Sequence, residues 1–198
     1  DTRSAPGCPS LPLRLSGRVE CMKFDKSRAA RALKESGFNG KLEMGFSRMG
    51  GDDIARGAEW FQGQWKRHLG LTVELQSEEQ AVYLRQLKVK PPAIFRKGVS
   101  LDRPTCLAGL EVFTKGNPEN YIRFEDAKYE ELVNELRRAK GEGKRRIACR
   151  KAVEHLLFTR RLIPLGEMYF TILVDPLYTG WDLNELNQLD LSRLQRKL

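Results

Sequence analysis

The side chains that could do acid–base or nucleophilic chemistry are few and scattered along this 198-residue chain. Its two histidines, His68 and His155, lie far apart, and neither accompanies a Gly-x-Ser-x-Gly motif or a Gly-rich phosphate loop. The adjacent carboxylates Asp52-Asp53 and Glu78-Glu79 open predicted helices, where the positive end of the helix dipole explains them. The residues therefore indicate a protein that is not an enzyme, and a hydrolase is the least favoured alternative.

Metal chemistry has equally little support. The four cysteines have no Cys-x-x-Cys spacing, and two histidines complete no Cys/His zinc site, so we expect no metal and no cofactor. One disulfide between Cys8 and Cys21 is compatible with the sequence, and so are buried free thiols.

The charge balance is basic, with a formal net charge of +9 and a sequence pI of about 9.5. Such a chain attracts anions, nucleic acid among them. Acidic and basic residues alternate from Glu125 to Arg150, however, which is typical of solvated helix faces with i,i+4 pairs. Nucleic acid is therefore not the favoured partner, although a stand-alone basic α/β module that binds an anionic partner such as nucleic acid remains the main alternative.

The elements that must position any site alternate between helix and strand. The stretch 24–38 predicts a helix that Asp25 caps and Gly37 ends. Ala29, Ala30 and Leu33 form its expected inward face. Strict alternation over 41–46 predicts a strand, with one face made of Leu42, Met44 and Phe46.

The same logic continues along the chain. Helical spacing runs from Asp52 to a stop at Gly70, and 71–75 predicts a second strand. Ser77-Glu78-Glu79-Gln80 resembles a capping box that opens another helix, and 91–95 predicts a third strand. This order is expected of a sheet covered by helices.

The second half of the chain predicts a short helix over 105–113, a helix capped by Asp126, a helix over 144–158 and a last strand over 163–174. Residues 1–22 carry three prolines and predict an extended lead-in. We therefore divide the chain into a lead-in (1–22), an α/β ligand-binding lobe (23–174) and a C-terminal segment (175–198).

Five stretches in this order resemble one protein family. They are Phe24 to Gly37, Leu69 to Leu75, Asp102-Arg103-Pro104, Asn120-Tyr121 and Arg160 to Leu165. Together they resemble the extracytoplasmic solute-binding proteins of family 5, the peptide-, dipeptide- and nickel-binding receptors of ABC importers. Each motif is weak alone, and their order and spacing carry the resemblance.

The resemblance implies a fold and a role. Family members are much longer, with two lobes that close on a ligand, and this chain is similar to the C-terminal lobe of that type II periplasmic-binding-protein fold. It would then be a fragment, with a mixed sheet flanked by helices and a last segment that returns to the missing N-terminal lobe. The implied role is to bind a peptide or similar small solute and deliver it to ABC permease subunits.

The family's ligand-facing positions fall on the loops at the sheet edge. In peptide-binding members, an Asp four residues before the matching proline holds the α-ammonium group of the ligand. Here that position is Ser100, which offers a neutral hydrogen bond, roughly half as strong as a charge-assisted one. Asp102 could substitute if the loop is shifted. Arg96, Lys97 and Arg103 indicate an anionic ligand group such as a carboxylate, and solvated loop charges are the alternative.

The complete set of expected ligand-binding residues is Phe46, Ser47, Arg48, Phe95, Arg96, Lys97, Ser100, Asp102, Arg103 and Tyr169. The resemblance implies a periplasmic or other extracytoplasmic location, with a lipoprotein possible. No apolar run approaches the ~20 residues that span a bilayer, and the first residues lack the pattern of a signal peptide.

Overall fold

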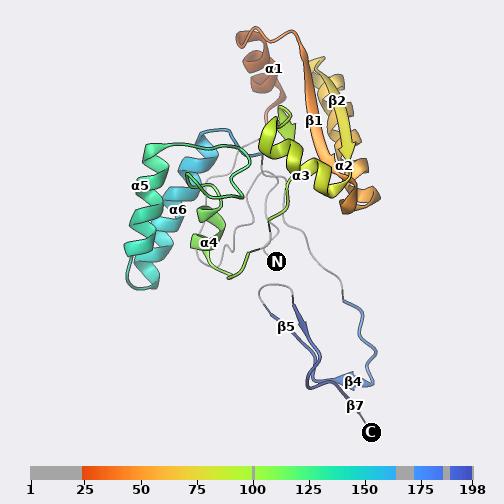
Figure 1. Cartoon of the computed structure of the whole chain (residues 1–198), viewed down its shortest axis with the longest axis vertical. Coiled ribbons are helices and arrows are strands. Elements are labelled where there is room, and N and C mark those ends of the chain that lie inside the picture. The colour runs from red at the N-terminus through yellow and green to blue at the C-terminus, as the bar shows by residue number, and fades with distance from the viewer. Residues whose placement is uncertain (1–23, 100, 164–171, 185–187, 198) are drawn as a thin grey trace. The chain divides into compact units, whose positions relative to one another are not determined.

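The computed structural model describes residues 24–99, 101–163, 172–184 and 188–197. The chain divides into two compact units at residues 99 and 100 (Figure 1). The sequence prediction treated 23–174 as one lobe, whereas the structure divides these residues into an α/β unit and a second unit with a helical core. The predicted domain boundaries stay predictions, and each unit is described by itself below.

The α/β unit (23–99) follows the predicted alternation of helices and strands. Its elements are α1 (Lys26–Glu35), β1 (Lys41–Ser47), the 3-10 turn η1 (Arg48–Gly50), α2 (Asp52–Leu69), β2 (Thr72–Glu78), α3 (Gln80–Val89) and β3 (Ile94–Phe95). Asp25 caps α1 by accepting the Arg28 N–H at 2.9 Å. Gly37 and Gly70 follow α1 and α2 with positive φ, as predicted, because a left-handed residue there costs glycine little.

The sheet of this unit is wholly parallel, in the order β2-β1-β3. β1 pairs with β2 along its whole length, from Lys41 opposite Thr72 to Ser47 opposite Glu78. This register places Leu42, Met44, Phe46, Val73 and Leu75 on one face, where α2 covers them with Ile54, Ala58, Phe61 and Trp65. α3 covers the opposite face, on which Gly45 contacts Tyr83 (Figure 1).

Two local predictions for this unit are wrong. The capping box at 77–80 does not form, because Ser77 and Glu78 belong to the β2 ladder and Glu79 caps α3 through the N–H groups of Ala81 and Val82. The ladder pairs seven residues of β2 with β1 through backbone hydrogen bonds, whereas a helix cap satisfies only one or two N–H groups. The expected inward face of α1 is not buried either, since Ala29 and Ala30 are exposed and Leu33 is partly exposed.

The helical core of the second unit is built from α4 (Cys106–Glu111), α5 (Ala127–Arg138) and α6 (Glu142–Phe158). Thr105 and Asp126 cap α4 and α5, and Asp126 also lies 2.9 Å from His155 Nε2, so His155 has a structural contact as expected. The Tyr129 hydroxyl, fully buried, donates to the Leu110 carbonyl at 2.7 Å and ties α5 to α4.

A disulfide between Cys106 and Cys149 joins α4 to α6 inside this core. The alternative of free buried thiols is therefore wrong for these two cysteines. The predicted Cys8–Cys21 pair lies outside the described residues. The Cys106–Cys149 pair spans 43 residues, and no local spacing rule indicates it.

The loop before α5 is held by one side chain. The Asn120 amide donates to the Thr114 and Phe124 carbonyls at 3.1 and 2.9 Å, while its oxygen accepts the Phe124 N–H at 3.0 Å. The neighbouring Tyr121 side chain is buried. The Asn120-Tyr121 motif is thus a structural feature of the helical unit.

The C-terminal segment contains two short antiparallel pairs. β4 (Tyr178–Thr179) pairs with β7 (Gln195–Arg196), and β5 (Asp182–Leu183) pairs with β6 (Leu189–Asp190). Most of the strand predicted over 163–174 lies outside the described residues, and residues 172–174 are not in a strand.

Candidate functional site

The carboxyl ends of the three parallel strands form the candidate site of the α/β unit. β1 ends at Ser47, β2 at Glu78 and β3 at Phe95, and the paired register places these ends at one edge. In open α/β sheets, ligands bind outside the carboxyl ends of the strands, where loops leave in different directions. Ser47, Arg48, Arg96 and Lys97, four of the predicted site residues, follow or end these strands.

A buried junction fixes the point at which the Arg96–Lys97 loop leaves the sheet. The Tyr83 hydroxyl shares its proton between the carbonyl oxygens of Gly45 (3.0 Å) and Arg96 (2.8 Å). The Arg96 N–H donates to the Gly45 carbonyl at 3.0 Å. Burial, with only 1% of the side chain exposed, raises the pKa of Tyr83 to about 12. The hydroxyl therefore stays protonated at neutral pH and can donate.

Gly45 is required at this junction for space. A Cβ at residue 45 would lie 2.7 Å from Pro92 Cγ and 3.2 Å from Tyr83 Cε2. Sequence reasoning missed the contact of Gly45 with Tyr83 and Pro92 because it joins residues far apart in the chain. A glycine inside a strand pattern was the available signal, since it often marks a close approach of another chain segment.

The loop after β1 is held by its own polar groups. The Ser47 hydroxyl accepts the Met49 N–H at 3.2 Å, which caps η1. The Arg48 guanidinium is exposed and donates to the Ser77 carbonyl at 3.1 Å, so it bridges the ends of β1 and β2. Its remaining N–H groups give this edge a fixed positive charge.

The predicted aromatic contacts differ in exposure. Phe46 lies in the hydrophobic core with 4% of its side chain exposed, so it offers a ligand little surface. Phe95 is half-buried on β3, Arg96 is exposed, and the Lys97 ammonium donates to the Gly98 carbonyl at 2.6 Å. The usable groups at this edge are therefore mostly cationic.

The remaining predicted site residues belong to the second unit. Arg103 pairs with Asp102 at 3.2 Å and with Glu111 at 3.6 Å, and Arg137 pairs with the same Glu111 at 3.0 Å. The Asp102 carboxylate thus already has a cationic neighbour. Ser100 and Tyr169 lie outside the described residues, so their predicted roles stay predictions.

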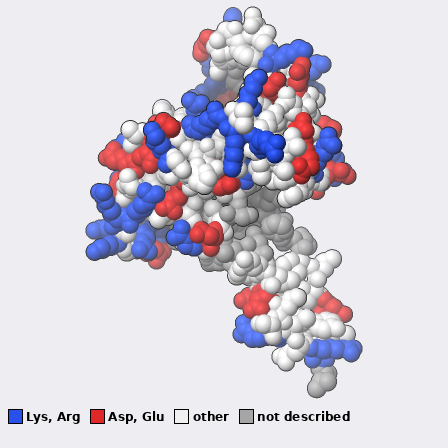
Figure 2. Space-filling model, viewed as in Figure 1, with Lys and Arg blue, Asp and Glu red and all other residues white. Residues whose placement is uncertain are grey.

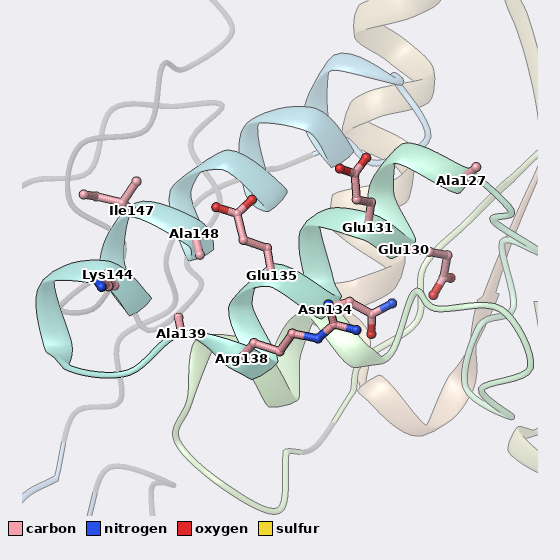
Figure 3. A pocket seen from close by; sticks show the side chains of 10 residues that line it. All are labelled: Ala127, Glu130, Glu131, Asn134, Glu135, Arg138, Ala139, Lys144, Ile147 and Ala148. Carbon is pink, nitrogen blue, oxygen red and sulfur yellow. The ribbon is translucent and has the colours of Figure 1, made fainter.

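A shallow groove runs along α5 and the start of α6 (Figure 3). Its acidic side chains already have partners, because Glu130 accepts the Lys115 N–H, Glu131 pairs with Lys128 and Glu135 pairs with Lys151. At the other end, Lys144 lines it near the apolar Ile147, while the Arg138 side chain reaches toward Asn134 in the middle of the groove (Figure 3). The groove has no converging polar groups of the kind that orient a small ligand.

The charges on the face shown in Figure 2 are largely mixed, with acidic groups beside most basic ones. In the described part of the chain, no cluster of three or more His, Cys, Asp or Glu side chains could hold a metal ion. Among the same residues, none of the helices is long and apolar enough to span a membrane.

The comparisons with known proteins rest on structure. No protein-family model matches the chain, and no curated protein matches it by sequence. Among solved structures, Haemophilus influenzae OppA in complex with RPPGFSPFR matches 94% of the chain with a TM-score of 0.79 and 18% identity. A periplasmic oligopeptide-binding protein of an ABC transporter from Borrelia burgdorferi matches 98% of the chain with a TM-score of 0.77 and 21% identity. HbpA2 from Haemophilus parasuis matches 100% with a TM-score of 0.76 and 20% identity.

The chain spans only part of each of these proteins, namely 38%, 40% and 40% of their lengths. Identities near one fifth show a shared fold. The predicted α/β class and the predicted resemblance to one part of a two-lobed binding protein are confirmed at that level. The chain therefore has the fold of the corresponding part of the family 5 periplasmic solute-binding proteins.

Proposed function

We propose that the chain is the C-terminal ligand-binding lobe of an extracytoplasmic solute-binding protein that serves a peptide-type ABC importer. The observation that carries the proposal is the match of 94% of the chain to OppA bound to RPPGFSPFR. Because the chain spans 38% of that protein, a further lobe would complete the cleft. Ligand binding would select the closed arrangement of the two lobes, which ABC permease subunits then recognise.

A buried disulfide supports the extracytoplasmic location. Cys106 and Cys149 are 4% and 1% exposed and join two helices of one core. Structural disulfides persist in oxidising compartments such as the periplasm and are rare in the cytosol. This observation is independent of the fold match.

The chemistry at the sheet edge favours an anionic group on the ligand. Arg48 and Arg96 are exposed beside Lys97 at the carboxyl ends of β1 and β3. Guanidinium groups bind a carboxylate through two parallel hydrogen bonds. We infer that this edge holds a carboxylate of the peptide. Asp102 is a weaker candidate for an ammonium group because Arg103 already pairs with it.

The first experiment incubates the immobilised chain with a mixture of peptides and identifies the retained peptides by mass spectrometry at two salt concentrations. We expect retained peptides whose binding falls only modestly with salt, because salt screens the single carboxylate contact but not the remaining hydrogen bonds. If the chain retains no peptide but binds nucleic acid with steep salt dependence, the anionic-partner alternative is correct, since each neutralised phosphate releases counterions.

A second experiment tests the site itself. The double variant Arg96→Gln, Lys97→Gln should weaken binding of retained peptides by about tenfold or more, because charge-assisted hydrogen bonds contribute about 1.5–3 kcal/mol each. The matched control is Lys66→Gln, Arg67→Gln, which removes two adjacent exposed charges from the end of α2. Equal affinity of both variants and the unmodified chain would exclude this edge as the ligand site.

A further inference from the structure

The end of the α5–α6 hairpin carries a concentrated positive charge. Residues 137–146 contain six basic side chains and one acidic side chain. We call these six residues the basic tip: Arg137, Arg138, Lys140, Lys144, Arg145 and Arg146. All six are exposed, and Lys and Arg gather at the left of the molecule in Figure 2, where the hairpin ends. Within the stretch 125–150, where acidic and basic residues alternate, residues 137–146 therefore carry a local excess of positive charge.

Three of the six cations of the basic tip have partners within the chain, and two of these partners are carboxylates. Arg137 pairs with Glu111 at 3.0 Å and Arg146 with Glu142 at 2.6 Å, while Arg145 Nε donates to the Ala139 carbonyl at 3.2 Å. Arg138, Lys140 and Lys144 make no ion pair with the described part of the chain. These three cations surround a tight connection between two helices and are available to a partner.

The composition of the tip favours a lipid surface over single-stranded nucleic acid. Residues 137–151 contain no aromatic side chain, so the tip offers no platform on which bases could stack. Ile147, with 51% of its side chain exposed, lies beside Lys144 at the end of the groove in Figure 3. An apolar residue flanked by cations is the combination that binds at the boundary between headgroups and acyl chains.

The compartment points to the same partner. Cys149 of α6 forms the buried disulfide, which fits an oxidising location outside the cytoplasm. We propose that the basic tip docks the protein onto an anionic phospholipid surface through Arg138, Lys140 and Lys144, with Ile147 as its apolar contact. This goes beyond the proposed function, because it concerns where the receptor sits and not which solute it binds.

The test measures partitioning of the full chain onto sedimented vesicles of phosphatidylcholine with and without phosphatidylglycerol. The triple variant Arg138→Gln, Lys140→Gln, Lys144→Gln breaks no ion pair within the described residues. We expect it to lower the partition coefficient for anionic vesicles by about fivefold per charge, or about a hundredfold in all. Binding to pure phosphatidylcholine should be weak for both proteins.

The matched control removes three charges elsewhere. Arg28→Gln, Arg31→Gln, Lys34→Gln changes the net charge equally on the exposed helix α1, and we expect unchanged partitioning. A charge-conserving variant, Lys140→Arg, Lys144→Arg, should bind vesicles normally because it keeps the positive charges of the tip, and circular dichroism shows whether the triple Gln variant is folded. Equal losses in both triple variants would overturn the proposal, because net charge alone would then explain binding.

Two further outcomes would overturn it. One is binding that does not depend on phosphatidylglycerol. The other is tighter binding of duplex DNA than of anionic vesicles in the same buffer, lost in the basic-tip variant. The basic-tip variant should bind peptides with unchanged affinity, because the tip is not part of the proposed peptide site. A failure of the vesicle test therefore leaves the peptide-binding proposal untouched, and a failure of the peptide test leaves the lipid proposal untouched.

Discussion

The α/β unit and the helical core of the second unit differ in how they are held together. The helical cluster contains thirteen buried residues and a disulfide, whereas the sheet cluster contains four buried residues with partly buried ones around them. In the α/β unit, a continuous backbone ladder and the Tyr83 junction supply much of the order. The candidate site thus lies on the unit with the smaller core.

Exposed apolar side chains occur in both units, since Phe158 of α6 is 78% exposed. In the α/β unit, Trp60 is 60% exposed, and Met49 and Val89 are more exposed still. Parallel sheets are normally covered on both faces by further structure. In this unit α2 and α3 cover the two faces of the sheet, so the contrast between the units lies in the size of the buried cluster and in the disulfide.

The largest expected effect comes from removing the disulfide. Cys106→Ala, Cys149→Ala should destabilise α4, α5 and α6 by about 2–5 kcal/mol, because the crosslink limits the unfolded chain and sits in a packed core. Amide exchange in the β1–β2 ladder should not change. Hydrogen exchange followed by mass spectrometry across a urea series measures the unfolding of each unit separately. Parallel loss of protection in both would mean that they unfold together, and the comparison would fail.

The next effect should be confined to the α/β unit. Gly45→Ala forces a Cβ against Pro92 and Tyr83 and should cost about 1–3 kcal/mol by overpacking. Its control is Gly63→Ala on α2, where a Cβ meets nothing within 4 Å and should stabilise the helix by up to about 1 kcal/mol. Hydrogen exchange of the β1 amides across a urea series gives the unfolding midpoint of the α/β unit in each of the two variants. A Gly45→Ala protein as stable as the control would show that Tyr83 and Pro92 have room to move.

The smallest effect depends on pH and belongs to the helical core. The Asp126 carboxylate accepts a hydrogen bond from the Tyr129 N–H and contacts His155, and these two interactions lower the pKa of Asp126 below its ordinary value of 3.8. Because the folded pKa is the lower one, this stabilisation is complete above the unfolded value and disappears as pH falls through the folded pKa. We expect Asp126→Asn, which keeps the cap, to lose up to about 1 kcal/mol near neutral pH.

That difference should vanish in strong acid, where both side chains are neutral. Urea titrations at several pH values between neutrality and strong acid measure it on the α5 amides. A constant difference at every pH would show that the Asp126 charge contributes nothing and that only its geometry matters.

Prediction from the sequence succeeded where local rules decide. The caps at Asp25 and Asp126 and the stops at Gly37 and Gly70 are confirmed, because each depends on a few neighbouring residues. The class and the resemblance to one part of a two-lobed binding protein also follow from the order of elements, which the solved structures confirm at the level of fold. Arg48 and Arg96 follow strands that the sequence also predicted, and their role in binding stays a prediction.

Prediction failed where distant segments compete. Ser77 and Glu78 read as a helix cap, yet a seven-residue ladder with β1 makes them a strand. Alternation placed Phe46 on the same face as Leu42 and Met44 but could not show that α2 would bury it. Tyr83 reads as an ordinary helical core residue, and only the fold reveals that its hydroxyl joins two strand ends.

By itself, therefore, the sequence determined the helices, their ends, the strand periodicity and the basic balance of the chain, since all of these depend on neighbours within a turn or two. Tertiary structure alone decided the pairing of Cys106 with Cys149, the division into two units and the cationic edge where the strands end. It also decided which cations of the basic tip form ion pairs. These features depend on residues far apart in the chain, whose approach is set by burial and backbone pairing and not by local spacing.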